Sequence, residues 1–565
     1  MVIVPNWMIH SPASLLKFFS SPFVNTGGIV GLYRPITTLT LALNYWISGF
    51  DPNGFQAFNR LLHVLICLGI FWTVRLLIPR PPLTAFFTSL LFAVHPIQAE
   101  AITYISGRAD ALAALFFILA LYWFIRLRLS DSHPLKPYLL SLLFYSLALW
   151  SKESAITWLG VVLLTEWVYF SKGVVKDLLK QLRHDFWTVY VGYLMITLTF
   201  LTARFAVLKD IAVTPTTFLD NPLIYQKLLP RVLTALKIFF QSMLLFFWPR
   251  TFSADYSYNQ IPLLSRWNNP MALIVLALTA IFIALVLWSY LRTPNVFFGL
   301  GILVITYSIV GNIVIPIGTI RADRLMYLPQ LGLCIIGGAL LSSWANVFQA
   351  GVKKKILHGV ITLLVILLLG RTVMRNGDWK DALTLLEATL AASPYSVKAH
   401  NDLGSKYAGM NQPELALTHF RIAETIMPDN PDILANLALL KLGQGKIDES
   451  ISYCLRVLVI APNNAVIRNT LGSALAMRGD YAGAMDQFDI VIRKDPTNAA
   501  AHYNKANVLY LEGKDNEAIL EFDQTLVYDP NNAKARMGRD LLLQRTVQPG
   551  SPKQNPSPPP GKSPP

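Results

Sequence analysis

Charged residues are scarce in this chain of 565 residues: they make up 14% of it, whereas hydrophobic residues make up 53% and the mean hydropathy is +0.45. Soluble globular domains carry roughly 25% charged residues, so the composition excludes one ordinary soluble domain, and it also excludes a wholly disordered chain. Cysteine is scarce too. Cys67, Cys334 and Cys454 are odd in number and widely spaced, which excludes a disulfide framework and a cysteine zinc site.

Acidic residues are rare in the N-terminal part. Residues 1–375 hold 29 Lys and Arg against 12 Asp and Glu, a net charge of +17, whereas residues 376–565 hold 19 and 21, a net charge of −2. The basic excess therefore belongs to the apolar part, where Lys and Arg gather in cytoplasmic loops. A DNA-reading protein would carry this excess on a soluble module, so we expect no nucleic-acid partner.

Apolar runs of about 17–23 residues recur through this part, and such runs predict membrane-spanning helices because lipid offers no partner to free backbone groups. We place them at 56–78, 83–98, 109–127, 138–151, 155–170, 187–207, 271–290, 296–316, 327–345 and 356–373. Residues 231–249 form one further candidate. The sequence thus predicts an all-α fold that begins with a polytopic helix bundle over 56–375, with the lipid bilayer as its first partner.

The charge pattern assigns the two faces of this bundle. The basic intervals read as cytoplasmic are 79–82, 128–137, 171–186 and 350–355. This assignment places 1–55, 97–108, 151–154 and 208–230 on the outer face. If 231–249 spans, the C-terminal domain is cytoplasmic; if it is interfacial or re-entrant, that domain lies outside. The second alternative obeys the charge rule better, and we prefer it.

Residues 1–55 are predicted to be an outer-face loop or amphipathic segment, yet no signal peptide or earlier span precedes them. We hypothesise that the natural protein begins upstream with a spanning helix that this chain lacks. An in-frame apolar segment upstream of Met1 would support the hypothesis, and a stop codon directly upstream would refute it.

From residue 376 onward a repeat takes over. Prolines stand 34 residues apart at Pro394, Pro428, Pro462, Pro496 and Pro530, and 34 residues is the tetratricopeptide period. We predict four full repeats over 397–532, a half repeat at 378–393 and a capping helix to about 545. The repeat domain is thus an α-solenoid over 376–545, and the Pro-rich residues 546–565 are predicted to be a disordered tail.

A polar column shares this period on the first helix of each repeat: Asp402, Asn436, Thr470 and Asn504. Such a ladder could line the concave groove and bind the backbone of an extended peptide. The alternative is a solvated helix face, and the sequence leaves both open.

Four polar clusters fall on the predicted outer face of the bundle: 33–35, 95–110, 151–154 and 321–329. Polar residues beside spanning helices are costly and therefore point to function. Candidate phosphate-binding cations in these clusters are Arg34, Arg108, Lys152, Arg321 and Arg324. Candidate acids or bases are Asp110, Glu100, Glu153 and Asp323.

These residue types suit transfer from a lipid-phosphate donor. Arg and Lys bind a phosphate headgroup and stabilise charge on the leaving phosphate, and a carboxylate can accept the proton of an acceptor hydroxyl. The alternative is that the same charges only neutralise one another as ion pairs, and that His95 is a structural residue at a helix end. The sequence has no metal-ligand spacing and no nucleophile elbow, so we name no metal-ligand residues and predict no permanently bound cofactor, and the sequence leaves a divalent metal open.

The run HPIQAEAITYISGRADALAALFFILA at 95–120, together with YRP at 33–35, SKES at 151–154, ADRLMYLP at 322–329 and the trailing repeats, resembles the transmembrane and tetratricopeptide-repeat O-mannosyltransferase-like proteins. That family is placed among the GT-C glycosyltransferases. The resemblance implies that a sugar, most simply mannose, passes from a polyprenyl-phosphate donor to Ser or Thr of proteins on the outer or lumenal face, with the repeats presenting the acceptor.

One feature departs from the family. GT-C enzymes usually carry an acidic motif in the first outer loop, whereas here the first acidic residue is Asp51. Two alternatives therefore stay open: a non-catalytic membrane scaffold whose repeats recruit envelope proteins, and a transferase that acts on lipid or polysaccharide. The basic, cysteine-poor chain fits a bacterial inner membrane better than the endoplasmic reticulum.

Overall fold

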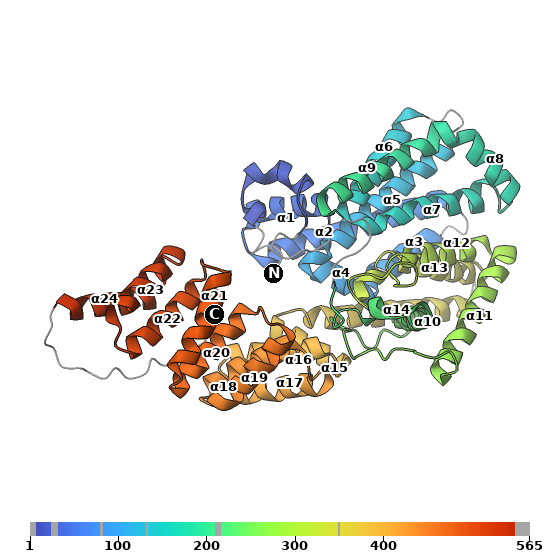
Figure 1. Ribbon diagram of the computed structural model, residues 1–565. Helices are drawn as coiled ribbons and strands as arrows, with labels where there is room; N and C mark the ends of the chain where they lie inside the picture. The colour runs from blue at the N-terminus through green and yellow to red at the C-terminus, as the bar shows by residue number, and fades with distance from the viewer. Residues whose placement is uncertain are drawn as a thin grey trace. The chain divides into compact units, whose positions relative to one another are not determined.

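The computed structural model describes residues 7–23, 32–79, 83–130, 134–209, 216–347 and 351–547, and within these ranges the regular elements are all helical (Figure 1). The chain divides into two compact units, Met1–Ser396 and Val397–Pro565. The predicted all-α fold, a membrane helix bundle followed by a solenoid, is confirmed. Residues 548–565 of the predicted tail lie outside the described residues.

The first unit holds the apolar helices. They are α1 (Pro35–Ser48), α2 (Pro52–Leu77), α3 (Thr84–Val94), α4 (Ala99–Thr103), α5 (Arg108–Arg128), α6 (Leu135–Ser151), α7 (Trp158–Thr165), α8 (Val175–Asp185), α9 (Val191–Leu208), α10 (Leu228–Phe247), α11 (Pro270–Arg292), α12 (Pro294–Ser308), α13 (Gln330–Val347), α14 (Gly351–Gly377) and α15 (Ala382–Ala392). Among the described residues, 7 helices are long and apolar enough to cross a membrane, or 8 if the bent pair Thr84–Val94 and Pro96–Thr103 is one span.

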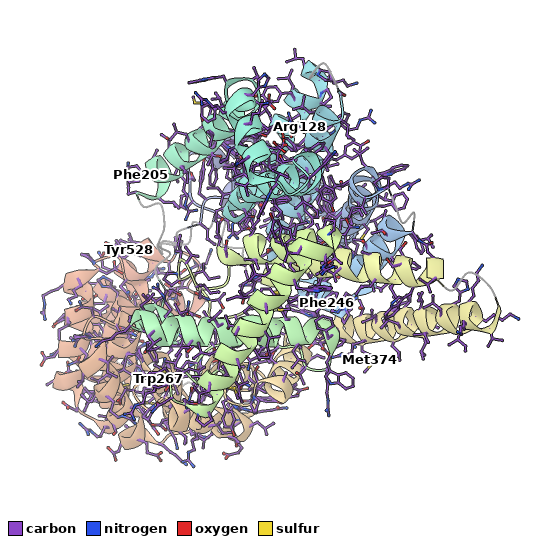
Figure 2. All side chains as sticks on the ribbon, turned by 90° about the vertical axis from the view of Figure 1, so that its right-hand side faces the viewer. Arg128, Phe205, Phe246, Trp267, Met374 and Tyr528 are labelled. Atoms are coloured by element: carbon purple, nitrogen blue, oxygen red, sulfur yellow. The ribbon has the colours of Figure 1, made fainter. Side chains whose placement is uncertain are left out.

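Helix α5 lies at the centre of this unit, packed between α2 and α6 (Figure 1). Its two ends mark two ends of the bundle. At the Arg128 end, Arg128 pairs with Glu166 at 2.8 Å and with Asp185 at 2.7 Å, and the described residues of two basic intervals, 128–130 with 134–137 and 171–186, lie here. At the Asp110 end, the segments between helices carry the polar clusters. Figure 2 shows Arg128 far from Phe246, which belongs to the Asp110 end.

Both ends of α10 contact the Asp110 end. In the last turn of α10, the carbonyl oxygen of Phe246 accepts a hydrogen bond from His95 Nε2 at 2.9 Å. Before α10, Asn221 donates to the carbonyl oxygen of Ile317 at 2.6 Å. The non-helical segment that follows α10 runs back along it, and Leu264 N donates to Thr234 Oγ1 at 2.9 Å. Because irregular backbone is not tolerated against lipid, these contacts favour an interfacial α10, although its length and hydropathy would allow it to cross.

The far end of α14 also belongs to the Asp110 end. Thr372 Oγ1 donates to the carbonyl oxygen of Val94 at 2.7 Å, and Thr103 Oγ1 donates to Asn376 Oδ1 at 3.0 Å. The chain therefore leaves the apolar helices at the end of the bundle where the polar clusters lie.

Three helix boundaries differ from the prediction. Residues 35–48, predicted to belong to a loop or amphipathic segment, form α1, which Pro35 starts at the first helical position, where proline costs nothing. The run 83–98 stops at Val94 because Pro96 follows. The run 296–316 stops at Ser308, and Asn312 then adopts φ +58 and donates to the carbonyl oxygens of Thr319 and Ile320.

The second unit is a stack of antiparallel helix pairs. It comprises α16 (Val397–Gly409), α17 (Pro413–Ile426), α18 (Pro431–Gly443), α19 (Ile447–Ile460), α20 (Ala465–Arg478), α21 (Tyr481–Lys494), α22 (Ala499–Leu511), α23 (Asp515–Tyr528) and α24 (Ala533–Val547). The four predicted repeats and the capping helix are all present. The half repeat is α15, which belongs to the first unit.

Close packing between the two helices of a repeat depends on glycine. A Cβ added to Gly472 on α20 would lie 2.5 Å from the Phe488 ring on α21, which is fully buried. We expect Gly472→Ala to destabilise this repeat by about 1–3 kcal/mol through overpacking, measured as faster hydrogen exchange over 465–494. Gly443→Ala is the control, because a Cβ there meets nothing within 4 Å. Equal protection in the two variants would contradict the packing role.

Candidate active site at the Asp110 end

Arg34 and Glu153 form a two-pronged ion pair at the Asp110 end. Arg34 precedes α1, and its Nε and terminal nitrogen donate to the two oxygens of Glu153 at 3.0 and 2.7 Å. Burial alone would raise the pKa of Glu153, but the charge and hydrogen bonds of Arg34 outweigh it and hold this pKa at about 2. Glu153 is therefore a fixed anion, and both of its carboxylate oxygens accept hydrogen bonds from Arg34.

Lys152 and Asp110 form a second pair beside the first. Lys152 Nζ donates to Asp110 Oδ1 at 2.5 Å, and both side chains are at least 88% buried. Burial lowers the pKa of Lys152, and the charge of Asp110 opposes that effect. Asp110 also lies within electrostatic reach of Arg34. Arg34, Lys152 and Asp110 come from three separate segments of the chain, and they lie close together at the first turn of α5.

Glu100 and Arg324 form the third pair. The guanidinium of Arg324 contacts one oxygen of Glu100, and the backbone N–H of Arg324 donates to the other oxygen at 2.9 Å. Asp110 contributes to the field at Arg324 as well, so the pair belongs to the same cluster. The guanidinium is 30% exposed, whereas Glu100 is buried, which leaves Arg324 accessible to a ligand.

Asp323 continues the cluster on the other side of Arg324. Tyr256 donates its hydroxyl to Asp323 Oδ1 at 2.9 Å, and Arg321 lies 3.8 Å from the same oxygen. Burial raises the pKa of Asp323, Arg321 opposes this shift, and Glu100 adds to it. The guanidinium of Arg321 also stacks over the Tyr256 ring at 4.3 Å.

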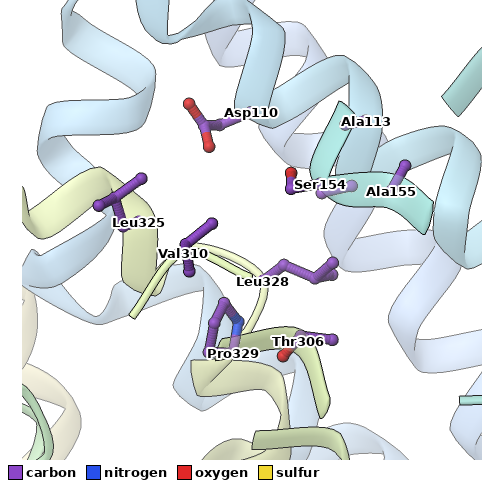
Figure 3. A pocket seen from close by; sticks show the side chains of 10 residues that line it. Asp110, Ala113, Ser154, Ala155, Thr306, Val310, Leu325, Leu328 and Pro329 are labelled. Atoms are coloured by element: carbon purple, nitrogen blue, oxygen red, sulfur yellow. The ribbon is translucent and has the colours of Figure 1, made fainter. Parts of the chain in front are cut away.

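A pocket opens between these ion pairs and the apolar helices. The residues that line it are Asp110, Ala113, Ala114, Ser154, Ala155, Thr306, Val310, Leu325, Leu328 and Pro329, and the space between them, counted out to its open mouth, is about 370 Å³. Figure 3 shows the Asp110 side chain extending from α5 toward this space, with Leu325 and Val310 on one side and Ser154 on the other. Of the four candidate carboxylates, Asp110 alone is among the lining residues.

Arg108 lies apart from the cluster, contrary to the expectation that it contacts a donor phosphate. It is fully buried, and it donates to Asn59, to Asn44 and to the carbonyl oxygens of Thr40 and Phe55 at 2.6–3.0 Å. Its donors thus join α5 to α1 and α2. We assign Arg108 a structural role, and we leave it out of the proposed site.

His95 has a structural position, as the alternative interpretation of the sequence expected. Its Nε2 bonds the carbonyl oxygen of Phe246, its Nδ1 accepts from the backbone N–H of Ile97 at 3.3 Å, and its ring stacks on Phe246. Both ring nitrogens are therefore engaged at the start of the 96–98 turn.

The residues of the polar column in the repeats differ in their burial and in their hydrogen-bond partners. Asn436 donates to Asn401 Oδ1 at 2.9 Å and so links the first helices of two successive repeats. Thr470 is buried and donates to the carbonyl oxygen of Val466 within its own helix. Asp402 is exposed, and Asn504 is half-buried. The structure thus leaves Asp402, Asn436 and Asn504 accessible to a peptide, whereas Thr470 serves its helix.

Two residues of the cluster were not among the predicted site residues. Tyr256 holds Asp323, and Arg204 contributes to the field at Glu153. Arg204 is the single charged residue of the apolar run 187–207, and an ionisable residue inside a spanning helix is a signal of function. Among the described residues, no group of three or more His, Cys, Asp or Glu is placed to hold a metal ion.

Comparisons with known proteins agree with this architecture. The tetratricopeptide repeat model matches residues 367–431 and 469–538. The chain is 26% identical over 418 residues to protein O-mannosyl-transferase TMTC3 of Mus musculus, a match covering 70% of this chain and 45% of that protein. It is 27% identical to the human TMTC4 and TMTC1 protein O-mannosyl-transferases, with 69% and 72% of this chain and 57% and 49% of those proteins covered.

Among solved structures, the crystal structure of MamA aligns with 29% of this chain and 96% of its own, at 19% identity and a TM-score of 0.25. The chain spans about half the length of the O-mannosyl-transferases that it matches. The fold and the cluster define a multi-pass membrane protein with a tetratricopeptide solenoid. Within that class, the chain is similar to the TMTC protein O-mannosyl-transferases.

Proposed function

We propose that this protein is a membrane glycosyltransferase that moves a sugar, most simply mannose, from a polyprenyl-phosphate donor to Ser or Thr hydroxyls of proteins. The observation that carries the proposal is the pocket lined by Asp110 at the end of an apolar bundle, with Lys152 bonded to that carboxylate and Arg324 within its electrostatic reach. The names of the relatives support the sugar and the protein acceptor.

Asp110 is the proposed base. The acceptor oxygen attacks the anomeric carbon of the sugar, the hydroxyl proton passes to the Asp110 carboxylate, and the bond from the anomeric carbon to the phosphate oxygen breaks with its electron pair staying on the phosphate. Lys152 holds the carboxylate in place through the hydrogen bond from its Nζ to Asp110 Oδ1. Attack from the face opposite the phosphate inverts the anomeric carbon.

Arg324 is the proposed contact to the donor phosphate, together with Arg34 and Arg321. A phosphate can share or replace the carboxylate partners of these guanidinium groups because it offers the same two-pronged geometry. Their charge then stabilises the leaving phosphate. Glu100, Glu153 and Asp323 orient these cations in this scheme.

We expect Arg324→Ala to lower kcat/KM for polyprenyl-phosphate mannose by about a hundredfold, because removing one donor at a developing anion costs about that much. The measurement is transfer of labelled mannose to a Ser/Thr-rich peptide in membranes. Arg126→Ala is the matched control, since Arg126 is exposed near the Arg128 end of α5. Undiminished activity of the Arg324 variant would remove this residue from the site.

The proposal places the repeats on the outer or lumenal face, in a bacterial inner membrane in preference to the endoplasmic reticulum. Support comes from α14, whose last turn lies at the Asp110 end, and from the basic intervals at the Arg128 end. We expect a periplasm-dependent reporter to be active when fused after Arg375 or after residue 545, and inactive when fused after Arg128. Activity after Arg128 alone would reverse the assignment.

A non-catalytic scaffold is the second candidate, since every carboxylate of the cluster already has a cation partner. Mapping O-linked mannose on membrane and secreted proteins, with and without the gene, separates the candidates. The scaffold predicts an unchanged map. A transferase that acts on lipid or polysaccharide predicts changed glycolipid with the protein map intact.

A further inference from the structure

The turn that ends the first unit is docked on the loop that follows α10. Ser393 and Ser396 are both fully buried. Ser393 Oγ donates to Ser253 Oγ at 2.8 Å, and Ser396 Oγ donates to Asp255 Oδ2 at 2.5 Å. Buried hydroxyls need such partners, because an unsatisfied polar group costs about 1–3 kcal/mol. The two serines therefore hold the turn to the loop at both of its ends.

Backbone hydrogen bonds fix the middle of the same turn. Asn259 N donates to the carbonyl oxygen of Tyr395 at 3.0 Å, and Tyr395 N donates to Gln260 Oε1 at 3.1 Å. A further hydrogen bond joins Ser257 Oγ and Ser396 Oγ at 3.4 Å, so the described residues of the turn make five hydrogen bonds to residues 253–260. These hydrogen bonds hold the last residues of the first unit, up to Ser396, on this loop.

The loop that seats the turn also carries a residue of the candidate active site. Tyr256 donates to Asp323, and its hydroxyl oxygen accepts from the backbone N–H of Ser253 at 3.1 Å. Ser253 in turn accepts from Ser393. A continuous path of hydrogen bonds therefore joins the last turn of the first unit to Asp323, which lies next to Arg324 in the sequence. The repeats begin at Val397, one residue after this turn.

We propose that the docked turn is an anchor that fixes Ser396, the residue from which the repeats start, relative to the candidate active site of the first unit. An acceptor protein held by the repeats would then present its hydroxyls at a defined reach, and the anchor would select which of them receive sugar. The inference rests on the proposed function, because it needs transfer to a protein. A short acceptor that bypasses the repeats would not depend on the anchor.

The test is an insertion of about twelve Gly and Ser residues between Ser396 and Val397, which keeps the turn docked but frees the spacing. Transfer from labelled polyprenyl-phosphate mannose is measured to a short Ser/Thr-rich peptide and to a protein whose occupied site has been mapped in wild-type cells. We expect unchanged transfer to the peptide. Transfer to the mapped site of the protein should fall at least about fivefold, because fixed spacing raises the effective concentration of the acceptor.

A second variant breaks the anchor without lengthening the chain. Ser393→Ala/Ser396→Ala should reproduce the loss on the protein acceptor and speed hydrogen exchange over 253–260. Its control, Thr418→Ala/Thr425→Ala, removes two exposed hydroxyls that bond only within their own helix. Equal transfer to the mapped site by wild type and insertion variant would overturn the anchor, as would an equal loss on both acceptors. No transfer by the wild type to either acceptor would instead overturn the proposed function.

Discussion

Replacing Asp110 with asparagine is expected to lower the rate of sugar transfer by about a hundredfold to ten-thousandfold, which is the contribution of a positioned general base. The amide keeps the shape of the side chain and an oxygen for Lys152, but it cannot accept the proton of the acceptor hydroxyl. The KM for the donor should change far less than kcat, since Asp110 acts on the acceptor. The measurement is mannose transfer in membranes with protein amounts equalised.

Asp185→Asn is the matched control for this variant. Asp185 is also a buried carboxylate in an ion pair, with Arg128 at 2.7 Å, but it lies at the other end of the bundle. Both substitutions weaken a buried ion pair, so both should lower stability by a similar amount. Only the Asp110 variant should lose sugar-transfer activity. Comparable activity losses in the two variants would show that the Asp110 effect is structural.

The choice of Asp110 over the other carboxylates follows from their surroundings. Glu153 gives both oxygens to Arg34, and Glu100 gives both to Arg324. Asp323 is 2% exposed and is not among the residues that line the pocket. Among the described residues, Lys152 is the one hydrogen-bond donor to Asp110. Asp110 therefore combines contact with one cation and access to the pocket.

The sequence predicted the repeats well because their signal is local. A period of 34 residues, with prolines and small residues at fixed positions, defines a helix pair and its stacking without knowledge of the rest of the chain. The apolar runs likewise predicted most membrane helices, since lipid imposes helical structure. The boundaries failed where tertiary contacts decide them, as at Asn312, whose side chain caps the turn after α12.

For the candidate site, the sequence predicted the types of residue but not which of them pair with one another. Arg34 and Glu153 stand 119 residues apart, and Glu100 and Arg324 stand 224 apart. Over such separations in the sequence, the charges of the residues do not show which cation pairs with which carboxylate. Charge also does not separate an arginine that pairs with a carboxylate from one that donates to backbone carbonyls and amide side chains. Arg108 belongs to the second kind, although its sequence context resembles that of the first.

Replacing Arg108 with alanine is therefore expected to prevent stable folding. The change leaves the acceptor oxygens of Asn59, Asn44, Thr40 and Phe55 without this donor, and each buried unsatisfied group costs about 1–3 kcal/mol. The cavity left under Phe58, which stacks on the guanidinium, adds to this cost. Thermal unfolding in detergent should show a large fall in Tm or no monodisperse protein at all.

Arg324→Ala provides the contrast for this last experiment, because it makes the same chemical change at a guanidinium that is 30% exposed. Its Tm should fall less than that of the Arg108 variant, because Glu100 loses its cation but keeps the backbone N–H of residue 324 as a donor, while its transfer activity falls. The Arg108 variant should show the reverse order, with activity per folded molecule retained in any fraction that survives. An Arg108 variant that folds with an unchanged Tm but transfers no sugar would restore this residue to the donor site.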